Sequence, residues 1–418
     1  MLETRLFTEM FVRKLLLVFS VCLQTSVFAQ TKVGDTYPGW TPGYMDIHHI
    51  NTGRGECVFA ILPDGTSMMI DAGAVASSSS TADARPNSSK SPGEWITRYV
   101  NRMMLPLAEK KIDYLFLTHF HGDHMGDVHV SQQKAAKGNY IRSGITEVGD
   151  KIPFRKIIDR SYPKYDAPSG LADSENMQNY IRFVKWQVGK GASAEQFKVG
   201  ANDQFKLLKQ ADKYPGFEIR NLAANGYVWT GVQNQVRKQF TAKNTTAAAE
   251  LPGEDHYSAA IRISYGKFDY FNGGDLVNSS ATDSRPDIET PVGLVTGPVE
   301  VCEANNHGSY NAMGEAFLKA VRPRVLILQL WAVGQLENAG LQRMLSKTVY
   351  PGERDVFATN LAEADKKVIG RRINQMKSLH GHIVTRVHPG GDNFTIYILD
   401  DTTEDFSIKA IHGPYESR

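Results

Sequence analysis

Short apolar runs separated by polar turns organise the chain after residue 44. Three such runs cover residues 45–50, 57–62 and 67–73, and the turns between them contain Gly, Pro and Asp. Runs of this length between such turns are typical of β-strands. Residues 93–111 instead space their apolar side chains for one buried helix face, and residues 112–117 form a further apolar run. The pattern predicts three strands, a helix and a fourth strand, in that order.

Short apolar runs and helically spaced apolar residues continue to the end of the chain. Apolar residues recur at helical spacing in residues 176–188 and 314–321. Strands are expected at residues 144–148, 156–160, 217–226, 299–304 and 324–331, as a strand–turn–strand unit within 259–275, and as a hairpin within 381–399. Expected strands and expected helices therefore both occur along the whole length of the chain.

The composition is that of an ordinary globular protein. The 418 residues are 41% hydrophobic and 22% charged, which is enough for a sizeable core in one large domain or two to three smaller ones. The formal charge of +2 gives no strong signal for binding to nucleic acid or to an acidic membrane. The oligomeric state is left open.

The first 29 residues have the layout of a signal peptide. Arg13 and Lys14 precede the apolar residues 15–23, and a cleavage site ending in the small Ala29 follows. The apolar stretch is too short to span a bilayer comfortably. The pattern predicts removal of residues 1–29 and export of residues 30–418, to the periplasm or as a secreted protein, with no membrane span in the mature chain. An N-terminal membrane anchor is the alternative.

Two of the three cysteines, Cys57 and Cys302, lie in the predicted mature chain. An exported compartment permits a disulfide between them. Two buried free thiols are equally compatible, because the sequence does not place their Cα atoms within bridging distance. Both alternatives stay open.

Residues 118–124 read Thr-His-Phe-His-Gly-Asp-His and hold a dense group of potential metal ligands. Three His and an Asp in so short a segment stand far above the background of 12 His in 418 residues. Imidazole and carboxylate together suit zinc and its divalent neighbours. The segment directly follows the predicted strand 112–117, so it is expected on the loop at the carboxyl end of that strand, where open α/β folds usually place their chemistry. The pattern predicts a metal site.

An H-x-H-x-D-H motif after an apolar strand resembles the signature of the metallo-β-lactamase fold superfamily. The strand, the Gly53-Arg54-Gly55-Glu56 turn, the Pro63-Asp64-Gly65 hairpin and the Ile70-Asp71-Ala72-Gly73 end are also similar to one branch of it. That branch is the hydrolase domain of the bacterial DNA-uptake channel protein, with its free-standing exported relatives. The resemblance implies an α/β fold, a four-layer αβ/βα sandwich of the metallo-β-lactamase type. Residues 30–418 would form it as a single domain, with an insertion at about 130–250 beside the active site.

The resemblance also implies roles for individual residues. Asp71 supports the metal-binding loop from beneath, and Asp275 of the Gly273-Gly274-Asp275 end bridges two metals. The ligands of the first metal include His119 and His121, and those of the second are Asp123, His124 and His307. Relatives read His-His-Gly-Ser where this chain has Asn306-His307-Gly308-Ser309.

The third ligand of the first metal is not defined by the sequence. In relatives it is usually a His a few residues before the Ser that begins the next strand, which is Ser258 here. Glu254 stands four residues before Ser258 and His256 two residues before it. A Glu254 ligand, a His256 ligand and an incomplete first site all remain open.

These features predict a metal-dependent hydrolase that uses a metal-bound hydroxide. Two divalent ions, Zn²⁺ first and Mn²⁺ or iron as alternatives, would activate a water that Asp123 orients. The sequence contains no Ser nucleophile elbow, P-loop or dinucleotide fingerprint, which favours water as the nucleophile. A phosphoester or phosphodiester is the expected substrate. The alternatives are a lactone, thioester or amide (β-lactam-like) substrate, and a metal-binding protein without turnover.

Overall fold

Strands β1 to β4 follow the predicted order and form the centre of a large sheet. The computed structural model describes residues 31–131, 133–240, 252–279 and 285–418, and the predicted signal peptide lies outside these residues. Residues 33–418 form one compact unit. Within the described residues, no helix has both the length and the apolar character that crossing a bilayer requires.

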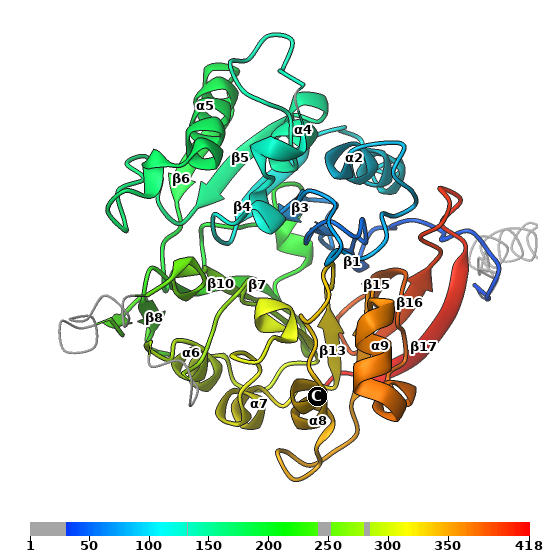
Figure 1. Ribbon diagram of the computed structural model, residues 1–418. Helices are drawn as coiled ribbons and strands as arrows, with labels where there is room; N and C mark the ends of the chain where they lie inside the picture. Colours follow the sequence, from blue (N-terminus) through cyan, green and yellow to red (C-terminus); the bar gives the residue numbers. More distant parts are fainter. Residues whose placement is uncertain (1–30, 132, 241–251, 280–284) are drawn as a thin grey trace, which may run out of the picture. The chain divides into compact units, whose positions relative to one another are not determined.

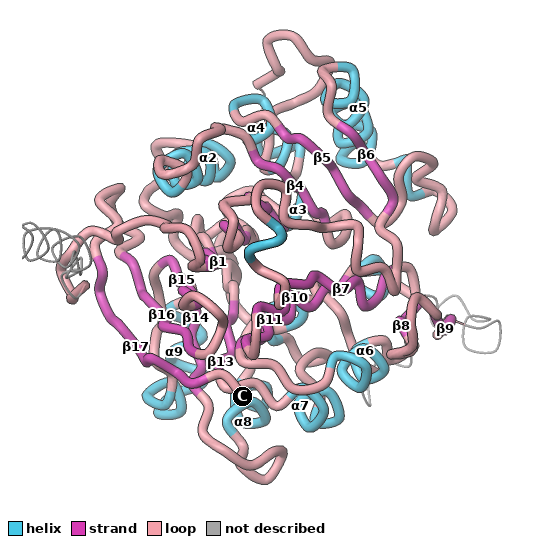
Figure 2. Tube along the Cα trace, turned by 180° about the vertical axis from the view of Figure 1, so that it is seen from behind, coloured by secondary structure: helices cyan, strands magenta, loops and turns pink. Residues whose placement is uncertain are grey.

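The first sheet contains nine strands among the described residues. Its order is β17 (Ile408–Glu416), β16 (Asn393–Leu399), β15 (His382–Val387), β1 (Met45–His49), β2 (Val58–Ile61), β3 (Ser67–Ile70), β4 (Ile112–Leu117), β5 (Phe154–Asp159) and β6 (Ser193–Gln196). Strands β3 to β6 are parallel, while β17, β16, β15, β1, β2 and β3 pair antiparallel. Figure 2 shows β15, β16 and β17 side by side at one edge.

The second sheet contains eight strands in the described part of the chain. Its order is β14 (Asp355–Ala358), β13 (Val325–Leu328), β12 (Val301–Glu303), β11 (Phe268–Asn272), β10 (Ala260–Tyr265), β7 (Phe217–Ala224), β8 (Tyr227–Trp229) and β9 (Val236–Lys238). Strands β11 to β14 are parallel to one another.

Alternation along the strands divides the core into layers. On β4, Tyr114 and Phe116 join the core between the two sheets, whereas Leu115 and Leu117 face the other way. The period of two is that of a strand buried on both faces, which explains the continuous apolar run in the sequence. On β13 of the second sheet, Val325 and Ile327 meet the same central core.

Helices cover the outer face of each sheet. Helices α2 (Pro92–Met103), α4 (Ile145–Lys151) and α5 (Glu175–Gly189) pack on the first sheet, and α6 (Glu289–Thr296), α7 (Glu315–Val321), α8 (Asn338–Leu345) and α9 (Glu363–Ile369) pack on the second. Figure 1 shows the two helical layers on opposite sides of the strands. The predicted four-layer αβ/βα sandwich is confirmed.

Two local predictions are wrong. Residues 144–148 are predicted as a strand, but Gly144 is the N-cap of helix α4 and residues 145–148 are its first turn, because Ile145 and Val148 on one helical face both enter the core under the first sheet. Tertiary packing here outweighs the β-propensity of a short apolar run. The helix predicted over 93–111 ends at Met103, shortly before Pro106.

The segment predicted as an insertion, about 130–250, is built into both sheets where the structure describes it. Strands β5 and β6 extend the first sheet beyond β4, and β7 to β9 extend the second sheet beyond β10. Its hydrophobic residues therefore belong to the same cores as the rest of the domain.

Cys57 and Cys302 are both buried free thiols. Cys57 packs in the core on the helix side of the first sheet, and Cys302 packs on the helix side of the second. The two sheets separate them, which resolves the alternative left open by the sequence.

Candidate metal centre

The candidate ligands lie just beyond the carboxyl ends of strands from both sheets. Asp71 follows β3, the H-x-H-x-D-H segment follows β4, Asp275 follows β11 and His307 follows β12. The carboxyl ends of parallel neighbours meet at one edge of a sheet, so residues far apart in the sequence converge there. The short helix α3 (Gly122–Met125) carries Asp123 and His124.

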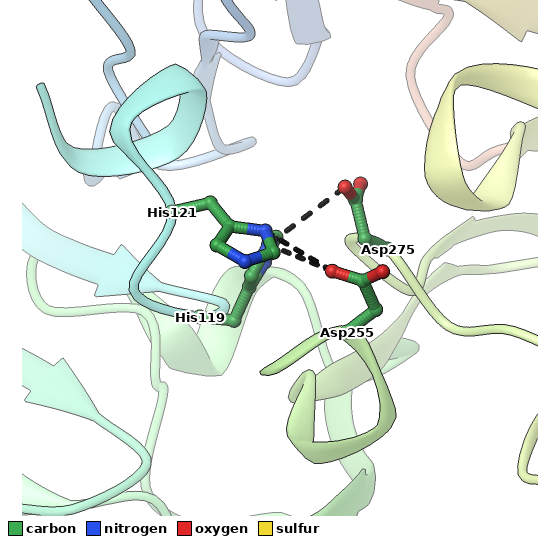
Figure 3. Close-up of side chains that lie close together, drawn as sticks. All are labelled: His119, His121, Asp255 and Asp275. Carbon is green, nitrogen blue, oxygen red and sulfur yellow. Dashed lines mark hydrogen bonds and ion pairs between the residues drawn. The ribbon is translucent and has the colours of Figure 1, made fainter. Parts of the chain in front are cut away.

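The first group of side chains consists of His119, His121, Asp255 and Asp275. The His121 Nδ1 atom lies 3.0 Å from Asp255 Oδ1, and His119 Nε2 lies 3.9 Å from the same oxygen. His119 Nε2 is also 3.7 Å from Asp275 Oδ2. Figure 3 shows the two rings from the β4 loop facing the two carboxylates.

The second group consists of Asp123, His124, Asp275 and His307. The His307 Nε2 atom lies 3.1 Å from Asp123 Oδ2 and 3.6 Å from Asp275 Oδ2. The His124 Nε2 atom lies 3.2 Å from Asp275 Oδ1. Asp275 thus offers its carboxylate to both groups, at the position where the resemblance places a bridging Asp.

The donor atoms fit divalent ions in their spacing. Two ligands of one tetrahedral ion lie about 3–3.5 Å apart, because each bond is about 2.0–2.2 Å long. Within each group the donor atoms all lie within 4.8 Å of one another. His124 Nε2, Asp255 Oδ1 and Asp275 Oδ1 are buried and make no hydrogen bond in the described structure. Buried polar atoms without a partner are costly, and an ion would satisfy them.

Asp255 supplies the remaining carboxylate of the first group. Neither Glu254 nor His256, the two candidates from the sequence, belongs to this group. Glu254 turns away and forms an ion pair with Arg160. His256 is buried, and its ring lies near that of Phe240. One feature of the sequence could have identified Asp255: it lies between the two candidates Glu254 and His256. In a tight turn, three successive side chains point in different directions, so only one of the three can face the metal centre.

His307 belongs to the second group, and Asn306 does not. The Asn306 side-chain amide donates to Asn311 Oδ1 instead. Both residues have positive φ angles, 44° for Asn306 and 57° for His307. Asn tolerates this left-handed region better than most residues, which is consistent with its presence beside the ligand.

Asp71 contacts the metal-binding loop from below, as the resemblance implies. Its Oδ1 accepts the Thr118 backbone N–H at 2.8 Å, and its Oδ2 accepts the Thr118 hydroxyl at 2.7 Å. The His124 Nδ1 atom is 2.8 Å from Asp71 Oδ2. With Nδ1 bound in this way, Nε2 of His124 is directed toward the second group.

Glu56 performs a similar role for His307, and the sequence does not single it out beyond its place in the Gly-rich turn. The His307 Nδ1 atom lies 2.7 Å from Glu56 Oε1 and 3.0 Å from the Gln329 carbonyl oxygen. Both contacts leave Nε2 facing Asp123 and Asp275. Burial raises the pKa of Glu56 to about 8, although the nearby His307 lowers it.

Trp331 is a further neighbour that the sequence does not indicate. Its indole N–H donates to Asp123 Oδ2 at 3.1 Å. Because this oxygen also lies near His307, the Asp123 carboxylate has a fixed orientation. The side chain of His121, by contrast, is 46% exposed and marks the open side of the centre.

The centre has a strong attraction for positive charge. The surrounding carboxylates are Glu56, Asp71, Asp123, Asp255 and Asp275. Burial lowers the pKa of His121, but the Asp255 carboxylate, 3.0 Å from His121 Nδ1, outweighs burial and raises the pKa to about 9. Burial also opposes protonation of His124 and His307, yet Asp275 and its neighbours raise both pKa values well above the usual range. The carboxylates thus favour positive charge at His121, His124 and His307, whereas burial and the neighbouring His rings lower the pKa of His119.

Residues 53–176 match the family model described as the metallo-beta-lactamase superfamily. A search of curated proteins gives no match. Similar solved structures include CmlA, a diiron beta-hydroxylase from Streptomyces venezuelae, at 13% identity and a TM-score of 0.38; the match covers 83% of this chain and 55% of CmlA. This chain therefore spans about half the length of CmlA.

Two further structures are matched over nearly their whole length. Zn(2+)-bound PqqB from Methylobacterium extorquens is 9% identical with a TM-score of 0.40, and the match covers 82% of this chain and 99% of PqqB. A putative metal-dependent hydrolase from Parabacteroides distasonis is 14% identical with a TM-score of 0.35, with coverage of 78% and 97%. The segment matched by the family model contains Glu56, Asp71 and the whole H-x-H-x-D-H motif, so this part of the chain is similar to the metallo-beta-lactamase superfamily.

Proposed function

We propose that the protein is a metal-dependent hydrolase with two divalent ions, one in each group of ligands. The observation that carries the proposal is Asp275, whose carboxylate lies between two complete groups of two His and two Asp. The superfamily consists mostly of hydrolases, which supports turnover. Two sequence features favour a metal-binding protein without turnover: Asn306 in place of a His, and the absence of a third His for the first metal. The positions of His307 and Asp255 weaken both arguments.

Bound divalent ions would supply Lewis-acid activation of a water and of the scissile bond. The protein's own residues orient the reactants. Asp123, fixed by Trp331 and close to His307, would accept the proton of the attacking water. Asp71 and Glu56 would hold His124 and His307 in the required orientations. Substrate would enter on the side of the exposed His121.

A phosphoester or phosphodiester is the substrate class that we propose. Two neighbouring cation positions suit in-line displacement at phosphorus, because they can stabilise both the attacking and the leaving oxygen. The resemblance of the N-terminal strands to the DNA-uptake hydrolase domain supports the same class. Zinc fits the donor set, and so do manganese and iron, because imidazole and carboxylate suit all three.

Metal analysis combined with a substrate panel tests the proposal. The purified protein is expected to bind two ions per chain and to hydrolyse a chromogenic phosphodiester faster than a lactone or a β-lactam. Asp275→Asn is expected to lower both metal content and kcat/KM at least a hundredfold, because Asp275 serves both groups. Asp269→Asn, on the same strand β11 but paired with Arg262, is the matched control and should keep both ions. A wild-type protein without stoichiometric metal would refute the proposal.

A further inference from the structure

Arg160 is a fully buried cation close to the first group of ligands. It directly follows strand β5, and its side chain has no exposed surface. Its guanidinium donates to Glu254 in bidentate fashion, with Nη2 2.6 Å from Oε2 and Nε 3.0 Å from Oε1. The remaining donors bind the Ala167 carbonyl at 2.7 Å and Asn225 Oδ1 at 2.9 Å. The rings of Phe120 and Tyr257 lie 4.6 and 5.1 Å from the guanidinium.

Glu254 connects this cation to the metal-binding loop. Its Oε1 accepts the backbone N–H of Phe120 at 2.9 Å. Phe120 is the residue between His119 and His121, the two His of the first group. Glu254 itself begins the short 3-10 turn η6 (Glu254–Tyr257), which carries Asp255. One carboxylate thus joins the two segments that supply ligands to the first group.

The other contacts of the turn hold its far end. The Ala259 N–H donates to the Thr118 carbonyl at 3.0 Å, and the Asn225 N–H donates to the Tyr257 carbonyl at 3.1 Å. The Ser258 hydroxyl accepts the backbone N–H of Asp275 at 3.2 Å. Both ends of the turn are therefore attached to the segments that carry the ligands.

We propose that the Arg160–Glu254 ion pair is a positioning device that makes Asp255 a ligand of the first metal. Successive residues of a 3-10 turn point about 120° apart, so the direction of one side chain determines that of the next. With Glu254 held against Arg160, Asp255 faces His119 and His121, and His256 enters the core. This inference rests on the proposed metal-dependent function, and both residues act through Asp255 rather than on substrate.

The energetics of the pair agree with a positioning role. A buried ion pair adds little net stability, because its desolvation offsets the attraction between its charges. Arg is suited to this place because its planar fork matches a carboxylate and stacks on aromatic rings, whereas the ammonium group of Lys does neither. The partners described for Arg160 and Glu254 include none of Asp123, His124 and His307. We therefore expect the pair to affect the first group more than the second.

Titration of the metal-free full chain with Mn²⁺ tests the proposal in wild type, Arg160→Met and Glu254→Gln. Wild type is expected to bind two ions and to show the electron paramagnetic resonance signal of a spin-coupled pair. Arg160→Met should bind one ion with nearly unchanged affinity and the other at least tenfold more weakly, with a mononuclear signal. Glu254→Gln keeps an acceptor for the Phe120 N–H but loses the charge, so a smaller loss at the same position is expected.

Arg386→Met is the matched control. Arg386 forms another buried bidentate pair, with Asp46, between β15 and β1. Its removal should cost similar stability and leave both Mn²⁺ affinities unchanged. The positioning role would be overturned if Arg160→Met and the control both bound both ions more weakly, and to the same degree. It would also be overturned if Arg160→Met bound both ions with wild-type affinity. If Arg160→Met does not fold, wild-type affinities in Glu254→Gln overturn it. A wild-type protein that binds no Mn²⁺ or Zn²⁺ would instead refute the proposed function.

Discussion

Four buried histidines in the described part of the chain fall into two pairs with opposite shifts in pKa. His124 and His307 face carboxylates, which raise their pKa values despite burial. His48 and His382 are buried on β1 and β15, and burial lowers their pKa values to about 3 and about 4. The Nδ1 atom of His382 accepts the Asn51 backbone N–H at 3.0 Å, which requires the neutral ring. The carboxylates around His124 and His307 favour cations, whereas the neutral rings of His48 and His382 make the folded state less stable at low pH.

The second pair predicts a pH dependence of stability. An unfolded His gains its proton near pH 6.5, whereas folded His382 gains it only near pH 4, so the unfolded chain binds more protons between these values. Stability from this residue is complete above about pH 6.5 and decreases by about 1.4 kcal/mol per pH unit as pH falls toward 4. His382→Gln should remove this slope. Between pH 6.5 and pH 5, the free energy of unfolding by urea, with a chelator present, should therefore fall by about 2 kcal/mol less in the variant than in wild type.

The control for this experiment is His129→Gln, because the His129 side chain is 71% exposed. This variant should follow the wild-type curve. An identical loss of stability in wild type and in His382→Gln would contradict the prediction.

Among the elements, helix α3 is held by backbone contacts rather than by its own length. The Ala72 N–H donates to the His124 carbonyl at 2.8 Å, and the Ala74 N–H donates to the Gly122 carbonyl at 3.0 Å. The Glu56 N–H donates to the Asp123 carbonyl at 2.8 Å. A helix of four residues has little intrinsic stability, so these contacts with the end of β3 and the turn before β2 determine where Asp123 and His124 lie.

The end of β3 approaches α3 so closely at Gly73 that a larger residue there should disturb the helix. A Cβ atom at Gly73 would lie 1.8 Å from the Asp123 carbonyl oxygen and 2.9 Å from its Cα, so α3 would have to move. Gly73→Ala is expected to lower the free energy of unfolding by about 1–3 kcal/mol and to weaken binding of the second ion at least tenfold. Differential scanning calorimetry and metal titration measure the two effects.

Gly189→Ala provides the comparison, because a Cβ there meets nothing within 4 Å. It should leave both metal affinities unchanged. Unaltered metal binding in Gly73→Ala would show that α3 tolerates displacement and that the backbone contacts do not position the ligands.

At the scale of the whole molecule, the two sheets and their helices form one unit from Val33 to Arg418. Three hydrophobic cores separate the four layers, and the metal centre lies where strand ends of both sheets meet. The ligands come from both sheets, with His119 to His124 from the first and Asp275 and His307 from the second. Metal binding should therefore stabilise the association of the two halves.

Export is a proposed property of the whole chain. We propose that residues 1–29 are removed as a signal peptide and that the mature chain is periplasmic or secreted. Expression of the full sequence in a bacterium, followed by fractionation and mass spectrometry, should give an exported chain that begins at Gln30. Because the unit described begins after this point, the mature chain should bind the same two ions as the full chain. A chain that stays uncleaved in the membrane fraction would support the N-terminal anchor instead.

The sequence determined the local features of this protein. The apolar run at residues 112–117 and the motif that follows it are contiguous, so the strand and its cluster of ligands could be read directly. Short apolar runs between turns predict most of the strands, and the resemblance implies Asp71, Asp275 and His307 as residues of the site. The four-layer fold followed from the same motifs.

The tertiary structure decided what depends on contacts between distant segments. The partner of Glu254 is Arg160, which lies 94 residues away, and this contact turns Asp255 toward the ligands. The contact of Glu56 with His307 joins a turn of the first sheet to a strand end of the second. Residues 145–148 became helical because the core beneath β4 accommodates one helical face. Propensity and spacing act over a few residues, whereas side-chain direction in a turn is set by whatever packs against it.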